Sequence, residues 1–320
     1  MIESLGIIPE KRLAYLPTRH WHAHEFSFFI HDQLARLLTE YEAAGVHSQV
    51  AEAFEQALIA KGIDPQDFDL IEFLKNNQFD SLYQRHLLGH LVIALTSDFC
   101  HFIYEALTAF EKRKFAVGYS LLRKPLKENL LFLCWILGNR HDFITRFEKN
   151  NYQTLNHLSK EKQTEIYQQA LDLLPFNQAY EANFLWGIIY SKTETHGLEP
   201  IWQKATHLIT SKGNLLRTGD YTINFIFHDP RENDLYDRLY LNLPYVLMFC
   251  MHVILECFSS LQKINDKTYS HLLLTALGTY ESLFSSQKLH IAPLLNKQLG
   301  FFLKCVHCKG PLKINKKNGA

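Results

Sequence analysis

The sequence predicts an all-α protein, a multi-helix bundle with one small β-hairpin near 214–227 as its only β-structure. Three observations support this prediction. Apolar residues recur with the period of an α-helix through long stretches, most clearly over 80–139 and 234–285. Residues that begin or end helices border such stretches, as Ser159 and Gly45 do. An alternation of period two, typical of strands, stands out within 214–227.

The composition is that of a globular protein. Of the 320 residues, 47% are hydrophobic and 21% are charged, which is enough to bury a substantial core. The 33 Lys and Arg residues balance the 33 Asp and Glu residues, so no global basic field is expected to attract nucleic acid, although a local patch is still compatible with this balance. The 17 histidines supply groups that titrate near neutral pH.

We expect a cytoplasmic protein without a membrane partner. The first residues lack a basic region followed by an apolar run, which predicts that there is no signal peptide. The longest uncharged run, 239–255, is shorter than the roughly 20 residues that span a bilayer, and we interpret it as a buried helix. The six cysteines are scattered apart from one C-x-x-C, which favours a reducing compartment.

The first residues, which include Pro9 and Pro17, are expected to be irregular, and the helices follow them. Pro125 lies inside the second central helix and predicts a kink or a fresh helix start there. We expect one helical domain over 1–303 and a Cys-containing basic tail over 304–320. The expected helices cover 19–45, 47–62, 64–77, 80–112, 113–139, 159–174, 176–197, 201–213, 234–263, 267–285 and 291–303.

The first central helix carries a polar seam. On a helical wheel its polar residues fall within about 120°. Exposed helix faces favour Lys and Glu, whereas this seam uses other types, so a wet groove is one interpretation and an ordinary exposed face is the alternative. Arg85 lies on the apolar side of the same helix, where a charge needs a partner. The seam consists of His86, His90, Ser97, Asp98, His101, Glu105 and Thr108.

Other charged and histidine clusters leave alternatives open. Arg123, Lys124 and Glu128 surround Pro125 and either form ion pairs that brace the bend or line the same groove. Three further histidines alternate at 20, 22 and 24. On a helix they would not face one site, so an interface or a solvated turn is the favoured interpretation, ahead of a metal cluster.

The segment from Arg85 to His90 resembles the Arg-x4–6-His signature of HEPN domains, and Arg19 and His24 have the same spacing. That superfamily comprises helical bundles, many of them metal-independent ribonucleases of bacterial defence and toxin–antitoxin systems. The resemblance implies a composite site made by dimerisation, in which Arg85 stabilises phosphate charge and His90 assists proton transfer. Segments 119–133 and 188–197 also look like parts of uncharacterised helical bacterial proteins, some linked to abortive infection.

The tail contains the motif Cys305-Val-His-Cys308-Lys-Gly310, which looks like one half of a zinc ribbon. A C-x-x-C spacing lets two thiolates reach one metal ion, and the glycine permits the tight turn that follows. A closed structural site needs four ligands. The missing ligands are left open between a second subunit, His290 or another histidine, and none at all. We expect Cys305 and Cys308 to hold a structural zinc ion.

The leading functional hypothesis is a bacterial stress or antiviral-defence protein of HEPN-like type that acts on RNA. Arg85 and His90 would be its catalytic pair, supported by His101 and Glu105. The alternative is a non-enzymatic helical scaffold or interaction protein with a zinc-binding knuckle at its C-terminus. We expect a homo-oligomer or a protein partner. A third hypothesis is a metal enzyme that uses the seam histidines together with Glu105.

Overall fold

The structure, a computed structural model, describes residues 3–45, 80–148, 158–211, 213–225, 233–284, 304–305 and 307–313, with isolated positions within 52–62 and 293–297. Its regular elements in these ranges are helices, which confirms the all-α bundle. The helices expected over 47–62, 64–77 and 291–303 lie almost wholly outside the described residues. The main helices are α1 (Trp21–Ala43), α4 (Asp80–Glu111), α5 (Phe115–Lys124), α6 (Leu130–Gly138), α7 (Arg140–Glu148), α9 (Lys160–Leu171), α10 (Ala182–Tyr190), α11 (Glu199–Thr206), α12 (Asp234–Leu261) and α13 (Asp266–Phe284).

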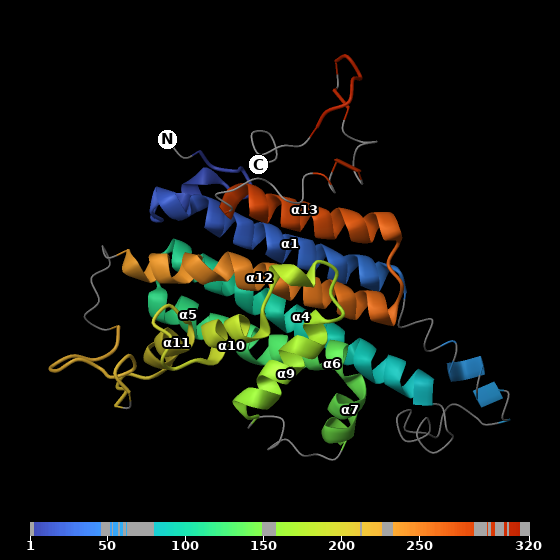
Figure 1. The fold of residues 1–320 in the computed structure, drawn as a ribbon, viewed down its shortest axis with the longest axis horizontal. Coiled ribbons are helices and arrows are strands. Elements are labelled where there is room, and N and C mark those ends of the chain that lie inside the picture. Colours follow the sequence, from blue (N-terminus) through green and yellow to red (C-terminus); the bar gives the residue numbers. More distant parts are fainter. Residues whose placement is uncertain are drawn as a thin grey trace.

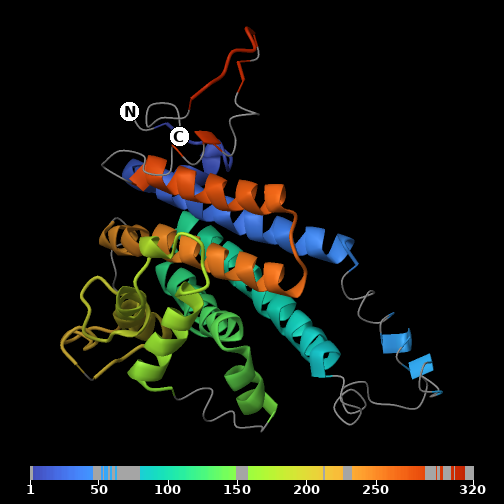
Figure 2. The same ribbon diagram turned by 45° about the vertical axis from the view of Figure 1, so that its right-hand side comes forward.

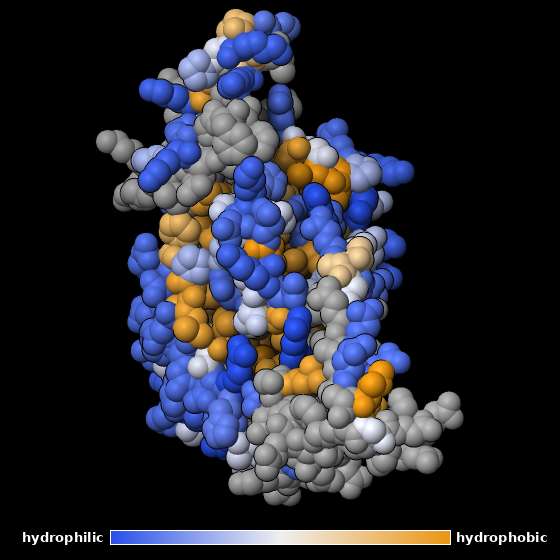
Figure 3. Space-filling model, turned by 90° about the vertical axis from the view of Figure 1, so that its right-hand side faces the viewer, coloured by the Kyte–Doolittle hydropathy of each residue, from blue (hydrophilic) through white to orange (hydrophobic). Residues whose placement is uncertain are grey.

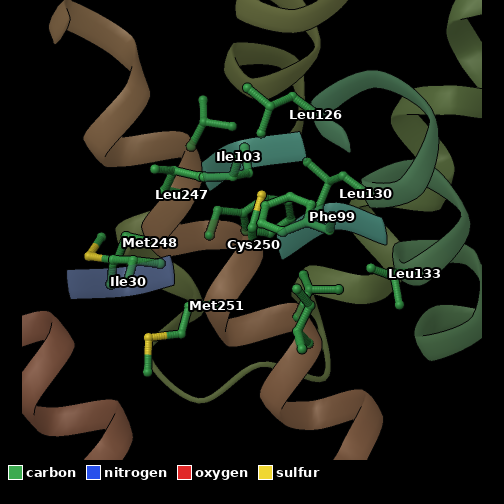
Figure 4. Close-up of a cluster of buried hydrophobic side chains, with 14 of the residues drawn as sticks. Ile30, Phe99, Ile103, Leu126, Leu130, Leu133, Leu247, Met248, Cys250 and Met251 are labelled. Carbon is green, nitrogen blue, oxygen red and sulfur yellow. The ribbon is translucent and has the colours of Figure 1, made fainter. Parts of the chain in front are cut away.

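The helix α12 is the centre of the bundle. In Figure 1 the long helices α13 and α1 lie along one side of α12, and α4 with the shorter helices α5, α6, α9, α10 and α11 lies on the other. Figure 2 shows the same arrangement from a second direction. Figure 4 shows Ile30 of α1, Ile103 of α4, Leu130 of α6 and Leu247 of α12 meeting in one cluster, and all four are fully buried. Each such side chain contributes about 1.5–3 kcal/mol of burial free energy.

The predicted turn between the two central helices is confirmed. Arg113 adopts a left-handed backbone conformation with φ 55°, and α5 then folds back along α4. A side chain at Gly118 would clash with the ring of Phe110, because its Cβ would lie 2.7 Å from that ring. A glycine at this position therefore lets the two helices approach closely.

At Pro125 the second central helix passes through a π-helical turn, Pro125–Asn129, before it continues as α6. Proline has no N–H, so the ordinary helical hydrogen-bond ladder is interrupted at the predicted place. Two residues of this region hold α4: Lys124 Nζ and Asn129 Nδ2 lie 2.8 Å from Asp98 Oδ2. Burial raises the pKa of Asp98, but these two hydrogen bonds outweigh it and lower the pKa overall. Polar groups beside the proline thus brace the irregular turn.

The hairpin expected near 214–227 is wrong for the part of it that the structure describes. Residues 213–225 form turns, and Tyr221 and Phe225 have left-handed φ values of 58° and 64° instead of extended ones. Side chains replace a strand partner here: Thr218 Oγ1 accepts from the Thr210 N–H, and Asn224 Nδ2 donates to the His207 carbonyl. Short polar side chains that bond to nearby backbone compete with strand pairing, which the alternating pattern alone does not show.

Two described helices are long and apolar enough to cross a membrane by length and composition, namely Leu82–Glu111 of α4 and α12. Inside the bundle, 83% of the apolar window of α12 is buried, against 39% of that of α4. The core helix of a bundle meets the same criteria as a membrane span. Figure 3 shows one end of the bundle, where hydrophobic residues are visible at the surface between hydrophilic ones.

Replacing Leu247 tests whether α12 is the core helix. Leu247→Ala removes a fully buried side chain and is expected to lower the free energy of unfolding by about 2–5 kcal/mol. The matched change Leu173→Ala, at a side chain that is 54% exposed, should cost about 0.5 kcal/mol or less. Urea unfolding of both variants measures the difference, and equal losses would contradict the assignment of α12 to the core.

Candidate functional site

The structure does not bring Arg85 and His90 together within one chain. Arg85 is half-buried, and its Nη2 donates to Gln262 Oε1 at 2.8 Å, at the end of α12. His90 is exposed and lies against His86, with ring centroids 4.5 Å apart. Five residues along an α-helix correspond to about 140° of rotation, so the two side chains leave α4 on different sides. In the described part of the chain Arg85 joins α4 to α12 and His90 faces outward.

The other two candidate catalytic residues, His101 and Glu105, are exposed and line a groove of about 410 Å³ between α1 and α4. Ser97 of the seam lies in the same groove, opposite His31 and Glu42 of α1. His31 Nδ1 lies 2.8 Å from Asp32 Oδ1 beside it. Part of the seam therefore lines a groove, as one of the two interpretations expected. This groove collects polar side chains without linking them into a hydrogen-bonded catalytic set among the described residues.

A second groove, of about 560 Å³, contains a tighter polar cluster. It lies where the beginning of α1 meets the beginning of α12. Asp237 is its anchor: Arg19 binds both carboxylate oxygens, at 2.8 and 2.9 Å, and His20 Nε2 lies 2.7 Å from Oδ1. Burial raises the pKa of Asp237, but the contacts with Arg19 and His20 outweigh it and keep the carboxyl ionised. Burial lowers the pKa of His20 despite Asp237, so the imidazole is neutral at pH 7.

Further cationic and aromatic groups complete this groove. Arg238, one residue after the anchor Asp237, also lines it and makes no ion pair within the part of the chain that the structure describes. His196 enters from the loop after α10, where Asn242 Nδ2 of α12 donates to its carbonyl at 2.6 Å. The ring of Tyr240 lies 5.3 Å from that of His20. Groups from three distant parts of the chain thus meet at one opening.

A buried chain of polar groups runs inward from this groove. The Tyr240 hydroxyl lies 2.5 Å from His24 Nδ1, and His24 Nε2 lies 3.3 Å from Glu111 Oε1. Arg12 completes the chain with a two-pronged contact to Glu111, its Nη2 at 2.5 Å and its Nε at 2.9 Å. His24 is fully buried and Glu111 is 6% exposed. Buried charges need partners of this kind, because removing one partner is strongly destabilising.

The protonation states of this chain follow from its surroundings. Burial raises the pKa of Glu111, but hydrogen bonds from His24 and Arg12 outweigh it, so Glu111 is a carboxylate. Burial lowers the pKa of His24, so its ring is neutral. An ionised Glu111 then takes the Nε2–H of His24, which leaves Nδ1 to accept from Tyr240. Burial raises the pKa of Tyr240, whose hydroxyl remains protonated.

This site escapes prediction from the sequence because its members are far apart in the chain. The expectation that the histidines at 20, 22 and 24 do not face one site is confirmed: His20 contacts Asp237, His22 contacts the Glu3 carbonyl, and His24 contacts Tyr240. The solvated turn suggested for them is wrong for His24, which is fully buried. The Arg-x4–6-His spacing of Arg19 and His24 does mark two of its residues, but Arg19 contacts Asp237 whereas His24 lies between Tyr240 and Glu111.

Cys305 and Cys308 lie in a formed turn. The Cys305 N–H donates to the Gly310 carbonyl at 2.9 Å, and the Lys309 N–H donates to the Cys305 carbonyl at 2.9 Å. Backbone N–H groups of Cys308 and His307 point at the Cys305 sulfur and, with the Cys308 thiol, lower the pKa of Cys305. Among the described residues no group of three or more His, Cys, Asp and Glu side chains is placed to hold one metal ion.

No protein-family model, curated protein or solved structure matches this chain. The geometry of the described residues is therefore the basis for a functional proposal.

The buried histidines predict a specific pH dependence. Burial lowers the pKa of His252 to about 3 and also lowers that of His24, so near pH 6 the unfolded chain binds protons that the folded chain does not. Each histidine should reduce the free energy of unfolding by about 1.4 kcal/mol per pH unit below about pH 6.5. Carboxyl groups, whose ordinary pKa in an unfolded chain is about 4, begin to contribute only at lower pH.

Urea unfolding between pH 6.5 and 5.0 measures this slope. His24→Gln and His252→Gln should each flatten it by about one proton, while the exposed His141 replaced by Gln should leave it unchanged. A slope that is identical in all three variants would contradict the neutral buried state of these rings.

Arg85→Ala tests whether Arg85 serves stability. Loss of its bond to Gln262 should lower the free energy of unfolding by about 1.5–3 kcal/mol. His90→Ala, at an exposed position of the same helix, should change it by about 0.5 kcal/mol or less. Thermal or urea unfolding measures the stability of both variants. If Arg85→Ala were as stable as the wild type, the structural role of this arginine would be contradicted.

Proposed function

We propose that the protein is a metal-independent endoribonuclease of bacterial stress or antiviral defence, with its site in the groove between α1 and α12. The observation that carries this proposal is the set of groups in one groove of about 560 Å³: two histidines, two arginines and an aspartate that holds one histidine. A volume of this size accommodates a nucleotide. The proposal keeps the expected chemistry of the Arg-x4–6-His resemblance and assigns it to different residues.

RNA cleavage needs a base, an acid and a cation. His20 suits the base: Asp237 takes its Nε2–H, which leaves Nδ1 unprotonated to accept the proton of a 2′-hydroxyl. The 2′-oxygen then attacks phosphorus, and His196 acts in its imidazolium form, giving a proton to the departing 5′-oxygen and becoming neutral. Arg238 stabilises the charge that develops on the phosphate. The products are a 2′,3′-cyclic phosphate and a 5′-hydroxyl end, so the chemistry is complete with side chains alone.

The buried chain behind the groove supports the proposal. Tyr240 forms part of the groove and is held from behind by His24, which Glu111 orients. A bundle gains nothing in stability from burying an ion pair that apolar side chains could replace. Perturbed, mutually oriented groups that border a cleft are typical of functional sites. Arg19 and His24, which share the HEPN-like spacing, are both members of this assembly.

Cleavage of a labelled RNA by the purified full-length protein tests the proposal. Single-stranded and structured RNAs are each incubated with and without EDTA, and products are examined for cyclic phosphate ends. His20→Ala and Arg238→Ala should each lower the cleavage rate about 100-fold or more, since general base catalysis and the stabilisation of developing charge each contribute that much. The matched controls His271→Ala and Arg217→Ala, at exposed positions outside the groove, should cleave like the wild type.

Three outcomes would overturn this assignment. The first is cleavage of a 2′-deoxy substrate, which lacks the attacking hydroxyl. The second is the absence of cleavage by folded wild-type protein. The third is a pair of results: a well-folded Arg85→Ala/His90→Ala double variant loses cleavage, while His20→Ala keeps full activity. These results would place the active site on α4, at Arg85 and His90.

A second candidate function is a non-enzymatic scaffold. It is favoured by Arg85, which joins α4 to α12 through Gln262 as a structural residue would. The groove between α1 and α4, with His101 and Glu105, would then receive a protein partner. Under this hypothesis the wild type binds a partner but leaves RNA intact.

A further inference from the structure

The C-terminal turn has the backbone of a metal knuckle, with Cys305 and Cys308 as its candidate ligands. Two backbone hydrogen bonds between Cys305 and the Lys309–Gly310 pair close the turn, and Lys304 pairs with Pro311 to form an antiparallel bridge across its base. Lys309 takes the left-handed conformation with φ 59°. The Cys308 sulfur lies beside Gly310, whose carbonyl accepts the Cys305 N–H, so the closed turn holds the two cysteines near each other. Two thiolates are therefore already arranged to share one ion.

This turn stands clear of the helices. Figures 1 and 2 both draw residues 304–305 and 307–313 in red, and these residues project beyond α1 and α13. In Figure 3 the same projection, at the top, is mostly hydrophilic. Cys308 is exposed and Cys305 is half-exposed. Both cysteines are thus accessible to a second molecule.

The same chain offers no third or fourth ligand in the part that the structure describes. No group of three candidate ligands occurs there. The other four cysteines, at 100, 134, 250 and 257, are buried in the helical core. Zinc bound by thiolates in a structural site takes four ligands in a tetrahedron, so two sulfurs leave half of the coordination sphere open.

We infer that two copies of this chain share one zinc ion, each supplying Cys305 and Cys308 to a tetrahedral four-thiolate site. Two identical outward-facing turns related by a two-fold axis fill the coordination sphere without any further group. Zn²⁺ replaces the thiol protons of the four cysteines, which are released to solvent, and no electron is transferred. This inference does not depend on the ribonuclease proposal, because the turn and the groove share no residue.

Gly310 fits this role. A Cβ at that position would lie 3.3 Å from Cys308 Sγ, closer than ordinary contacts allow. A side chain there would press on a sulfur that must reach the metal. Gly310→Ala is therefore expected to weaken zinc binding while both cysteines remain.

The test uses full-length protein freed of metal, to which zinc chloride is added under reducing conditions. Bound zinc is counted by mass spectrometry of the metal, and molar mass is measured by light scattering. The expected result is one zinc ion per two chains, together with a doubling of the molar mass that EDTA reverses. Cobalt in place of zinc should give the visible absorption of a tetrahedral site and the thiolate charge-transfer band of four sulfurs.

Variants separate the ligands from their neighbours. Cys305→Ser and Cys308→Ser should lose both zinc binding and zinc-dependent dimerisation, while His307→Ala, between them, should keep both. Because these residues lie outside the helical core, the variants should melt like the wild type. One zinc ion per monomer, zinc lost in His307→Ala, or no zinc bound by the wild type would each overturn the inference.

Discussion

The burial of α12 on nearly all of its sides is the constraint on which the rest of this bundle depends. A helix that is apolar all round must be covered all round, and α1, α4, α6 and α13 pack against it. The exceptions to its apolar character are informative. Asn242 bonds to the His196 carbonyl, and His252 lies 2.7 Å from the Tyr180 hydroxyl. The first turns of α12 carry the charged residues Asp234, Asp237 and Arg238. At these turns the helix lines the groove of about 560 Å³.

The buried chain from Arg12 to Tyr240 links this groove to the packing of three helices. Arg12 precedes α1, Glu111 ends α4 and Tyr240 belongs to α12, so one network ties together the helices whose contacts form the core. Removing Arg12 or His24 would leave a carboxylate buried without its partners, a change that typically costs several kcal/mol. The same network that fixes the helices fixes the position of Tyr240. Stability and the geometry of the groove are therefore coupled.

The fold was predictable wherever a local pattern decides the structure. The stop at Gly45, the Ser159 cap, the turn after α4 and the interruption at Pro125 all depend on residues within a few positions of one another. A turn at the cysteine motif was also predicted, but Lys309 takes the left-handed conformation there in place of Gly310. The hairpin prediction failed because the side chain of Thr218 accepts from the Thr210 N–H and that of Asn224 donates to the His207 carbonyl, and such local bonds compete with strand pairing.

The candidate site was not predictable, because tertiary contacts, which a spacing along the chain does not encode, decide which residues meet. Arg85 and His90 share the spacing of Arg19 and His24, yet the long rigid helix α4 turns the first pair to different sides. Arg19 precedes α1 by one short 3₁₀ turn, so its side chain can reach Asp237, which is 218 positions away. A motif of two residues specifies only their separation along the chain. It does not identify a third residue, such as a carboxylate that orients one of them. In this protein the partners of the two arginines differ: Arg19 meets the carboxylate of Asp237, which also holds His20, whereas Arg85 meets the neutral amide of Gln262.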